Sequence, residues 1–222
     1  MEKKLLFVFN PKSGKGLIKS KLLDIINIFV RHGYVVTVHP TQYAQDAYHV
    51  VKRTAATTDL IVCSGGDGTL AEVVTGIMES KVQVPMGYIP SGSTNDFASS
   101  LSIPKNMEKA ALEIMEGKLY GCDIGRFNGS TFVYIAAFGL FTDVSYQTDQ
   151  ALKNVLGHMA YILEGVKRIF DIKSYHLKIE ANGVKKDGNY IFGMVTNSRS
   201  VGGFKNLTGK NVEMDDGFFE VT

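Results

Sequence analysis

Residues 65–69, Gly-Gly-Asp-Gly-Thr, stand between two patterned segments and constrain the fold more than any other part of the sequence. Residues 59–64 form an apolar run that is typical of a short buried strand. Apolar residues then recur at helical spacing from Leu70 to Met78, and Thr69 with Glu72 fits the capping box that begins many helices. A glycine turn between a strand and a helix N-terminus exposes backbone N–H groups and the positive end of the helix dipole, which suits phosphate.

Asp67 is the unexpected residue of this turn, since a carboxylate repels the anion that the turn would bind. A bound cation or a sugar hydroxyl would remove the conflict. We therefore interpret the turn as one side of a site for a magnesium nucleotide. The alternative is a tight turn in which Asp67 only caps the helix.

Composition limits the other possibilities. The chain has 222 residues of which 45% are hydrophobic, enough for a substantial core, and its formal charge of 24 − 22 = +2 is too small to indicate nucleic acid as a partner. The two cysteines, Cys63 and Cys122, do not make a disulfide scaffold, so a cytoplasmic location is expected. No signal peptide is evident, and no apolar run is long enough to span a bilayer, so we expect no transmembrane segment and at most contact with a membrane surface.

Strand-like and helix-like segments alternate over the first 120 residues. Further strands are predicted at 5–9, 34–39 and 86–89, and further helices at 17–30, 44–56, 95–101 and 107–116. Such alternation indicates a parallel sheet with right-handed crossovers, in which ligands bind beyond the carboxyl ends of the strands. The glycine-rich and hydroxyl-rich loops all follow strands, and they should therefore share one edge.

The pattern changes near Gly121. Asn128-Gly129 and Asn182-Gly183 each lie between strand-like runs, which is a strong hairpin signal because both central residues of that turn need positive φ. A helix is predicted over 149–170 between the two hairpins. We therefore expect two domains, 1–120 with a parallel sheet and 121–222 with mostly antiparallel strands.

Two further loops accompany the first. Residues 10–16, Asn-Pro-Lys-Ser-Gly-Lys-Gly, are not a Walker A loop, because Phe9 stands where that pattern needs glycine and Gly16 stands where it needs Ser or Thr. They still form a glycine-rich turn into a helix, and an ordinary strand–helix turn is the alternative. Residues 90–97 carry hydroxyls at Ser91, Ser93 and Thr94 that could bind phosphate or sugar oxygens, with a simple helix cap as the alternative.

The three loops together resemble the diacylglycerol kinase catalytic-domain family, which includes bacterial lipid kinases and sphingosine kinases and is related to NAD kinases and phosphofructokinases. The matching residues run in family order along essentially the whole chain: Asn10-Pro11-x-Ser13-Gly14, residues 65–72, residues 90–98, Asp123-Ile124-Gly125, residues 137–140, 157–161, 202–204 and 215–218. One departure is Ala71, where bacterial relatives often have Asn. The resemblance implies an α/β fold, with an N-terminal nucleotide-binding domain like that of NAD kinase or phosphofructokinase. A mostly antiparallel β-sandwich domain would follow and be incomplete at its C-terminus.

The same resemblance implies that the protein is a transferase: a kinase that uses ATP and Mg2+ to phosphorylate a lipid hydroxyl, with diacylglycerol giving phosphatidic acid as the first candidate. Asp67 would orient the nucleotide and its magnesium, and Asp96 would face the acceptor hydroxyl or the phosphates. The implied nucleotide contacts are Asn10, Pro11, Lys12, Ser13, Gly14, Thr41, Gly65, Gly66, Asp67, Gly68, Thr69, Glu72 and Thr94. A second, structural magnesium would lie near Glu213, Asp216 and Phe218, although a plain hairpin turn is the alternative at residues 215–217.

The family usually carries its general base in a C-terminal Asp-Gly-Glu segment, and none occurs in this sequence. We therefore expect the sequence to be a shortened one that binds nucleotide but transfers phosphate poorly. The expected partner is a lipid at the inner membrane surface, and a homodimer is an open possibility. The alternatives are a small-molecule kinase of the NAD-kinase type and a nucleotide-binding regulator; an apolar pocket near Phe138, Leu140, Tyr161 and Phe204 would favour the lipid kinase.

Overall fold

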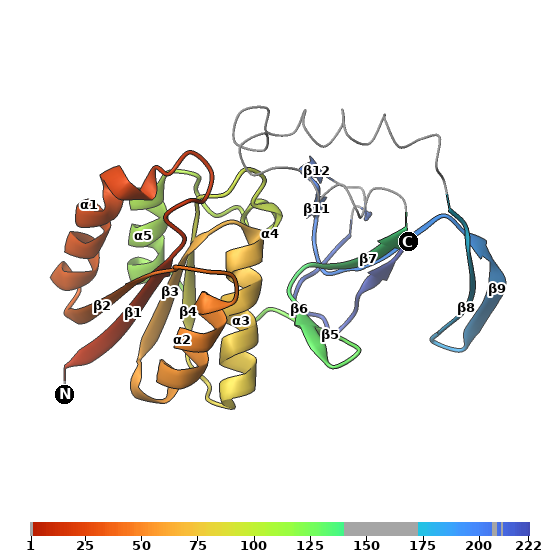
Figure 1. Cartoon of the computed structure of the whole chain (residues 1–222), viewed down its shortest axis with the longest axis horizontal. Helices are drawn as coiled ribbons and strands as arrows, with labels where there is room; N and C mark the ends of the chain where they lie inside the picture. The colour runs from red at the N-terminus through yellow and green to blue at the C-terminus, as the bar shows by residue number, and fades with distance from the viewer. Residues whose placement is uncertain (1, 140–172, 206–207, 210) are drawn as a thin grey trace.

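The computed structural model describes residues 2–139, 173–205, 208–209 and 211–222, and these form two lobes joined side by side (Figure 1). The first lobe holds the elements from β1 to α5, and the second holds those from β5 to β13. The helix predicted over 149–170 lies outside the described residues, as do Leu140 and Tyr161 of the predicted apolar pocket.

A four-stranded parallel sheet forms the centre of the first lobe, as the alternating pattern predicts. Its strands are β1 (Lys3–Phe9), β2 (Tyr34–Pro40), β3 (Leu60–Gly65) and β4 (Met86–Pro90), in the order β2-β1-β3-β4. Every residue of β3 is buried, which is typical of a parallel strand that helices cover on both faces.

Helices cover both faces of this sheet. Their bounds are α1 (Ile18–Arg31), α2 (Asp46–Thr54) with the 3-10 turn η1 (Ala55–Thr57), α3 (Asp67–Ser80), α4 (Asp96–Ser100) and α5 (Met107–Glu116). Successive residues of β1 point to opposite faces, so Leu5 and Phe7 pack against α1 and α5 while Leu6 and Val8 pack against α2 and α3. The lobe is therefore a three-layer α/β structure.

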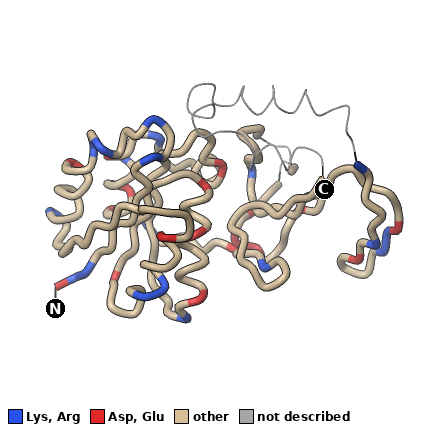
Figure 2. Tube along the Cα trace, in the orientation of Figure 1, with Lys and Arg blue, Asp and Glu red and all other residues tan. Residues whose placement is uncertain are grey.

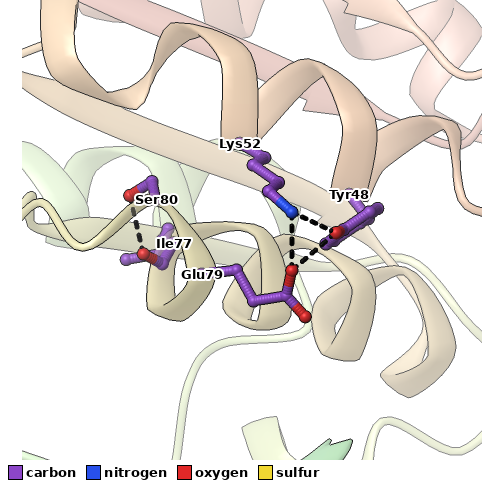
Figure 3. Close-up of polar contacts among 5 residues, drawn as sticks. All are labelled: Tyr48, Lys52, Ile77, Glu79 and Ser80. Carbon is purple, nitrogen blue, oxygen red and sulfur yellow. Dashed lines mark hydrogen bonds and ion pairs between the residues drawn. The ribbon is translucent and has the colours of Figure 1, made fainter.

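The helices α2 and α3 pack closely together (Figure 3). A Cβ atom at Gly76 would lie 2.9 Å from the carbonyl oxygen of Tyr48, so glycine permits this approach. On the exposed side of the contact, Glu79 Oε2 accepts hydrogen bonds from Tyr48 Oη at 2.6 Å and from Lys52 Nζ at 2.7 Å. Exposed ion pairs of this kind contribute about 0–1 kcal/mol each, so close apolar packing does most to fix α3 in place.

The second lobe contains the two predicted hairpins. They pair β5 (Gly125–Phe127) with β6 (Ser130–Phe132) and β8 (Tyr175–Ala181) with β9 (Val184–Tyr190). All four turn residues have positive φ: 48° and 85° at Asn128 and Gly129, 50° and 79° at Asn182 and Gly183. The Asn-Gly signal is confirmed in both places.

Antiparallel pairing continues through the rest of this lobe. The central strand β10 (Phe192–Thr196) pairs with β7 (Ile135–Gly139) and β13 (Glu220–Val221). The short strands β11 (Ser200–Val201) and β12 (Phe204–Lys205) pair with each other and lie near α4. The predicted succession of a parallel α/β region and an antiparallel β region is confirmed.

The two lobes share part of one core. Val133 and Met214 of the second lobe are 3% and 1% exposed and belong to the same buried cluster as Leu70 and Val74 of α3. Acidic and basic residues are interspersed over both lobes (Figure 2), which agrees with the small net charge. Within the described part of the chain, no helix combines the length and the apolar character needed to cross a bilayer.

Candidate functional site

The carboxyl ends of the four strands lie in register, and this register brings the predicted loops to one edge. Asn10 N–H donates to Ser64 O, Thr41 N–H to Phe9 O, and Ser91 N–H to Gly65 O, each at 2.9 Å. These bonds continue the strand ladders by one residue beyond the sheet. The residue after each strand is thereby held beside its neighbour.

Glycines allow the three loops to touch through their backbones. A Cβ atom at Gly92 would lie 2.5 Å from the Cα atom of Gly66, and one at Gly14 would collide with the carbonyl oxygen of Ser91. Gly14 also has a φ of 54°, in the left-handed region that favours glycine. A side chain at either position would collide with the backbone of a neighbouring loop, so glycine is what lets the three loops meet.

The loop after β4 keeps its shape through Asn95 and Tyr88. Asn95 has a φ of 56°, and its side chain accepts a hydrogen bond from Gly92 N–H at 2.9 Å and donates to Gly92 O at 2.8 Å. The buried hydroxyl of Tyr88 lies 3.0 Å from Gly65 O and 3.3 Å from Asn95 Oδ1. Tyr88 thereby connects this loop to the end of β3.

The predicted capping box at Thr69 and Glu72 is wrong. The N-cap residue of α3 lies three residues earlier, at Gly66, which is extended and makes no side-chain cap, and the helix begins at Asp67. Thr69 is buried against Gly65, where a Cβ atom would lie 2.6 Å from Thr69 Oγ1, and Glu72 accepts a hydrogen bond from Gln45 N–H at 2.9 Å. Thr69 therefore packs against the end of β3, and Glu72 stabilises the loop after Thr41, so neither side chain caps the helix.

Asp67 sits at the first turn of α3, where the loops meet. Its carboxylate accepts hydrogen bonds from Asp96 N–H at 3.1 Å and Phe97 N–H at 3.2 Å, at the start of α4. Burial and then the nearby negative charge of Asp96 raise the pKa of Asp67 to about 6, against the lowering effect of these hydrogen bonds. A divalent cation would favour the charged form, so the position fits a magnesium ligand.

Asp96 does not point to the open edge. Its side chain is 2% exposed, and its carboxylate accepts hydrogen bonds from Ser200 Oγ at 2.6 Å and from Gly202 N–H and Gly203 N–H at 2.8 Å each. All three donors belong to the second lobe. The carboxylate is therefore engaged between the lobes, whereas the family resemblance led us to expect it at the acceptor hydroxyl or the phosphates.

The remaining predicted nucleotide contacts lie along the same edge with different exposure. Ser13 is buried, Lys12 and Gly68 are exposed, and Asn10, Pro11, Thr41 and Thr94 are partly buried. The Lys12 N–H donates to Asn10 Oδ1 at 2.9 Å, which folds this loop back on itself. In the predicted apolar pocket, the Phe138 ring contacts that of Tyr175, with centroids 5.8 Å apart, and Phe204 is 54% exposed.

The predicted magnesium site near residue 216 has few side-chain ligands. Glu213 and Asp216 are both exposed, and Asp216 Oδ1 accepts a hydrogen bond from Phe218 N–H at 3.0 Å. No group of three or more His, Cys, Asp or Glu side chains suited to a metal occurs among the described residues. A cation there would depend on backbone carbonyls and water.

Asp123 is a residue of this region to which the sequence assigned no role. Its Oδ2 accepts a hydrogen bond from Gly217 N–H at 2.6 Å, and its backbone N–H donates to Met214 O at 2.7 Å. The signal available in the sequence was the Asp-Ile-Gly motif at residues 123–125. Its contact with the 214–217 loop, about 90 residues away, becomes visible only in the folded chain.

The fold and the candidate site define an α/β protein with glycine loops at one edge of its parallel sheet, and comparison with known proteins identifies its family. The model of the family described as "Diacylglycerol kinase catalytic domain" matches residues 4–127. The chain is 36% identical over 221 residues to the diacylglycerol kinase of Bacillus subtilis (strain 168) and 35% identical over 220 residues to that of Staphylococcus aureus (strain JH9). These matches cover 99% of this chain and 73% and 70% of the relatives.

Solved structures give the same result. A crystal structure of a diacylglycerol kinase from Bacillus anthracis str. Sterne superimposes with a TM-score of 0.76 at 26% identity, over 99% of this chain and 71% of that one. Another solved chain from the same organism has a TM-score of 0.84 at 29% identity. The chain belongs to the diacylglycerol kinase catalytic-domain family, a family of kinases.

Proposed function

We propose that the chain is an ATP-dependent lipid kinase that transfers the γ-phosphoryl group to a lipid hydroxyl, with diacylglycerol as the acceptor and phosphatidic acid as the product. The observation that carries the proposal is the meeting of three glycine loops, backbone against backbone, around Asp67. Backbone N–H groups and one partly buried carboxylate suit a phosphate chain neutralised by magnesium. The names of the relatives at 35–36% identity support the lipid acceptor.

The loop residues at the carboxyl edge of the parallel sheet would have different roles in binding the nucleotide. Glycine at residues 14, 66 and 92 lets the three loop backbones approach one another at this edge, and Asp67 would hold the magnesium that accompanies the phosphates. The bound nucleotide supplies the phosphoryl group, and such a reaction depends on positioning and charge neutralisation. We propose residues 1–120 as the nucleotide-binding domain and 121–222 as the domain that meets the lipid.

Binding and transfer need separate measurements. Calorimetric titration with ATP, with and without Mg2+, should show binding that depends on Mg2+ and is lost in Asp67→Ala. Transfer from ATP labelled at the γ-phosphate should then be followed to diacylglycerol, sphingosine, phosphatidylglycerol and NAD. Labelling of NAD alone would overturn the lipid proposal, and absence of ATP binding would overturn the nucleotide site.

We also propose that the protein works at a membrane surface, because its acceptor would reside in a bilayer. Sedimentation with vesicles of phosphatidylcholine, with and without diacylglycerol, tests this directly. Recovery of the protein in the supernatant under both conditions would contradict the surface proposal while leaving the nucleotide site intact.

A further inference from the structure

The contact between α4 and the second lobe is more elaborate than simple packing requires. Asp96 lies at the first residue of α4, and its buried carboxylate is bound by three donors from residues 200–203. Burying a carboxylate lowers the stability of the fold unless hydrogen-bond donors surround it, so the fold must place several donors around Asp96. All three come from a segment more than 100 residues away in the sequence.

The turn between β11 and β12 is shaped to hold this carboxylate. Gly202 and Gly203 have φ values of 59° and 79°, so both are left-handed, and their successive N–H groups point to different oxygens of Asp96. Consecutive backbone N–H groups that converge in this way form a concave anion site. Ser200, which is 2% exposed, adds its hydroxyl to Oδ1 at 2.6 Å.

The backbone of the same residue reaches the nucleotide site. The N–H groups of Asp96 and Phe97 donate to the two oxygens of Asp67, one each. Phe97 and Ala98 are buried in the core of the first lobe, and Asn95 connects the start of α4 to Gly92. The position of α4 therefore sets the orientation of the Asp67 carboxylate.

We propose that Ser200 and the Gly202-Gly203 turn are positioning elements of the nucleotide site: they fix Asp96, and through the start of α4 they fix the carboxylate of Asp67. The second lobe thereby sets the affinity of the first lobe for a magnesium nucleotide. This inference rests on the proposed nucleotide site. Because coupling between two sites is reciprocal, nucleotide binding must also tighten the hold of the turn on Asp96.

Two variants test the connection. Ser200→Ala removes the hydroxyl that reaches the Asp96 carboxylate. Thr208→Val is the matched control, because Thr208 Oγ1 donates to Ser198 O at 2.7 Å in the same part of the second lobe and not to that carboxylate. Each variant loses one hydrogen bond made by a side-chain hydroxyl of the second lobe.

Titration of each protein with ATP and Mg2+ gives the decisive comparison. Ser200→Ala should bind roughly fivefold more weakly than the wild type or worse, while Thr208→Val stays within about twofold. Equal affinities for the two variants would overturn the inference and leave the nucleotide site standing. Failure of the wild type itself to bind would overturn the site and the inference together.

Hydrogen exchange in the wild type tests the reciprocal effect without any variant. Addition of ATP and Mg2+ should slow exchange at the amides of Gly202 and Gly203. The amide of Gly183, at the tip of the β8–β9 hairpin, should not respond. Unchanged exchange at Gly202 and Gly203 under saturating nucleotide would contradict the coupling even if Ser200→Ala proved too unstable to study.

Discussion

The Cα atom of Gly66 lies so close to Gly92 that a Cβ atom at residue 92 would approach it to 2.5 Å. The same Cβ atom would lie 2.8 Å from Asn95 Oδ1, the acceptor that shapes the loop after β4. The obstructing atom at Gly66 belongs to the backbone and cannot rotate away. A side chain at residue 92 must therefore separate two of the three loops of the site.

Gly92→Ala should accordingly abolish binding of a magnesium nucleotide and lower the free energy of unfolding by about 1–3 kcal/mol, the usual cost of overpacking. Gly121→Ala is the control, because no atom lies within 4 Å of a Cβ there. Calorimetric titration and denaturant unfolding measure the two effects. Normal binding by a folded Gly92→Ala protein would show that the loops can separate without loss of the site.

Asp67 should make stability depend on pH in metal-free buffer. Its pKa in the folded chain, about 6, lies above the ordinary value of 3.8, so the folded state binds more protons between these values. The free energy of unfolding should therefore fall as pH rises from about 4 to 6 and stay lower above it, by about 1–3 kcal/mol in total. Asp67→Asn should lack this component. Unfolding curves of the two proteins measured across that pH range give the difference, and parallel curves would contradict it.

Tyr88 should matter to both stability and binding, because its buried hydroxyl bonds Gly65 O at 3.0 Å. Tyr88→Phe leaves that carbonyl without this partner, at a cost of about 1–3 kcal/mol, and should weaken nucleotide binding. Tyr48→Phe removes a hydroxyl that bonds Glu79 on the exposed side of α2 and α3 (Figure 3), and should cost less than about 1 kcal/mol. Equal losses in urea unfolding would show that burial of the Tyr88 hydroxyl is not decisive.

Magnesium without nucleotide tests the predicted second metal site. If the loop near Asp216 binds the ion, Mg2+ at about 100 times its dissociation constant should stabilise the wild type by about 2.7 kcal/mol, and Asp216→Ala should not respond. Asp187→Ala is the control, because Asp187 is an exposed acid of the β8–β9 hairpin that pairs with Lys178 at 3.9 Å. Thermal unfolding measures all three proteins. An equal response of Asp216→Ala and the wild type would exclude the loop as the site.

Much of the fold could be predicted because its signals are local. The periodicity of residues 70–78 predicts a helix and the Asn-Gly pairs predict two hairpins, and the structure contains all three. The rule that loops after parallel strands share an edge predicts that Asn10, Gly65 and Ser91 lie near one another, as they do. The start of α3 was misjudged because the capping-box pattern at Thr69 also suits a residue that packs beneath Gly65. Local sequence does not distinguish these two uses of one threonine.

The partners of Asp96 and Asp123 could not be predicted for a different reason. Ser200 and Gly217 lie 104 and 94 residues away from them, and nothing in the sequence indicates which distant N–H or hydroxyl group will meet a given carboxylate. The family resemblance drew attention to Asp96 as a site residue and to Asp123 as part of a motif. Their roles depend on how two lobes meet, and this arrangement is set by packing of the whole chain.

Val133 and Met214 belong to the second lobe but lie in the core cluster of the first, and Ile124 and Tyr134 pack against the same cluster. If the two lobes separated, these side chains would leave an apolar hollow beside Leu70 and Val74 and would themselves enter water. Unfolding of either lobe would therefore expose apolar core residues of the other lobe to water. Heating should give one cooperative calorimetric transition that covers both lobes. We therefore expect two lobes of different architecture to unfold as one thermodynamic unit.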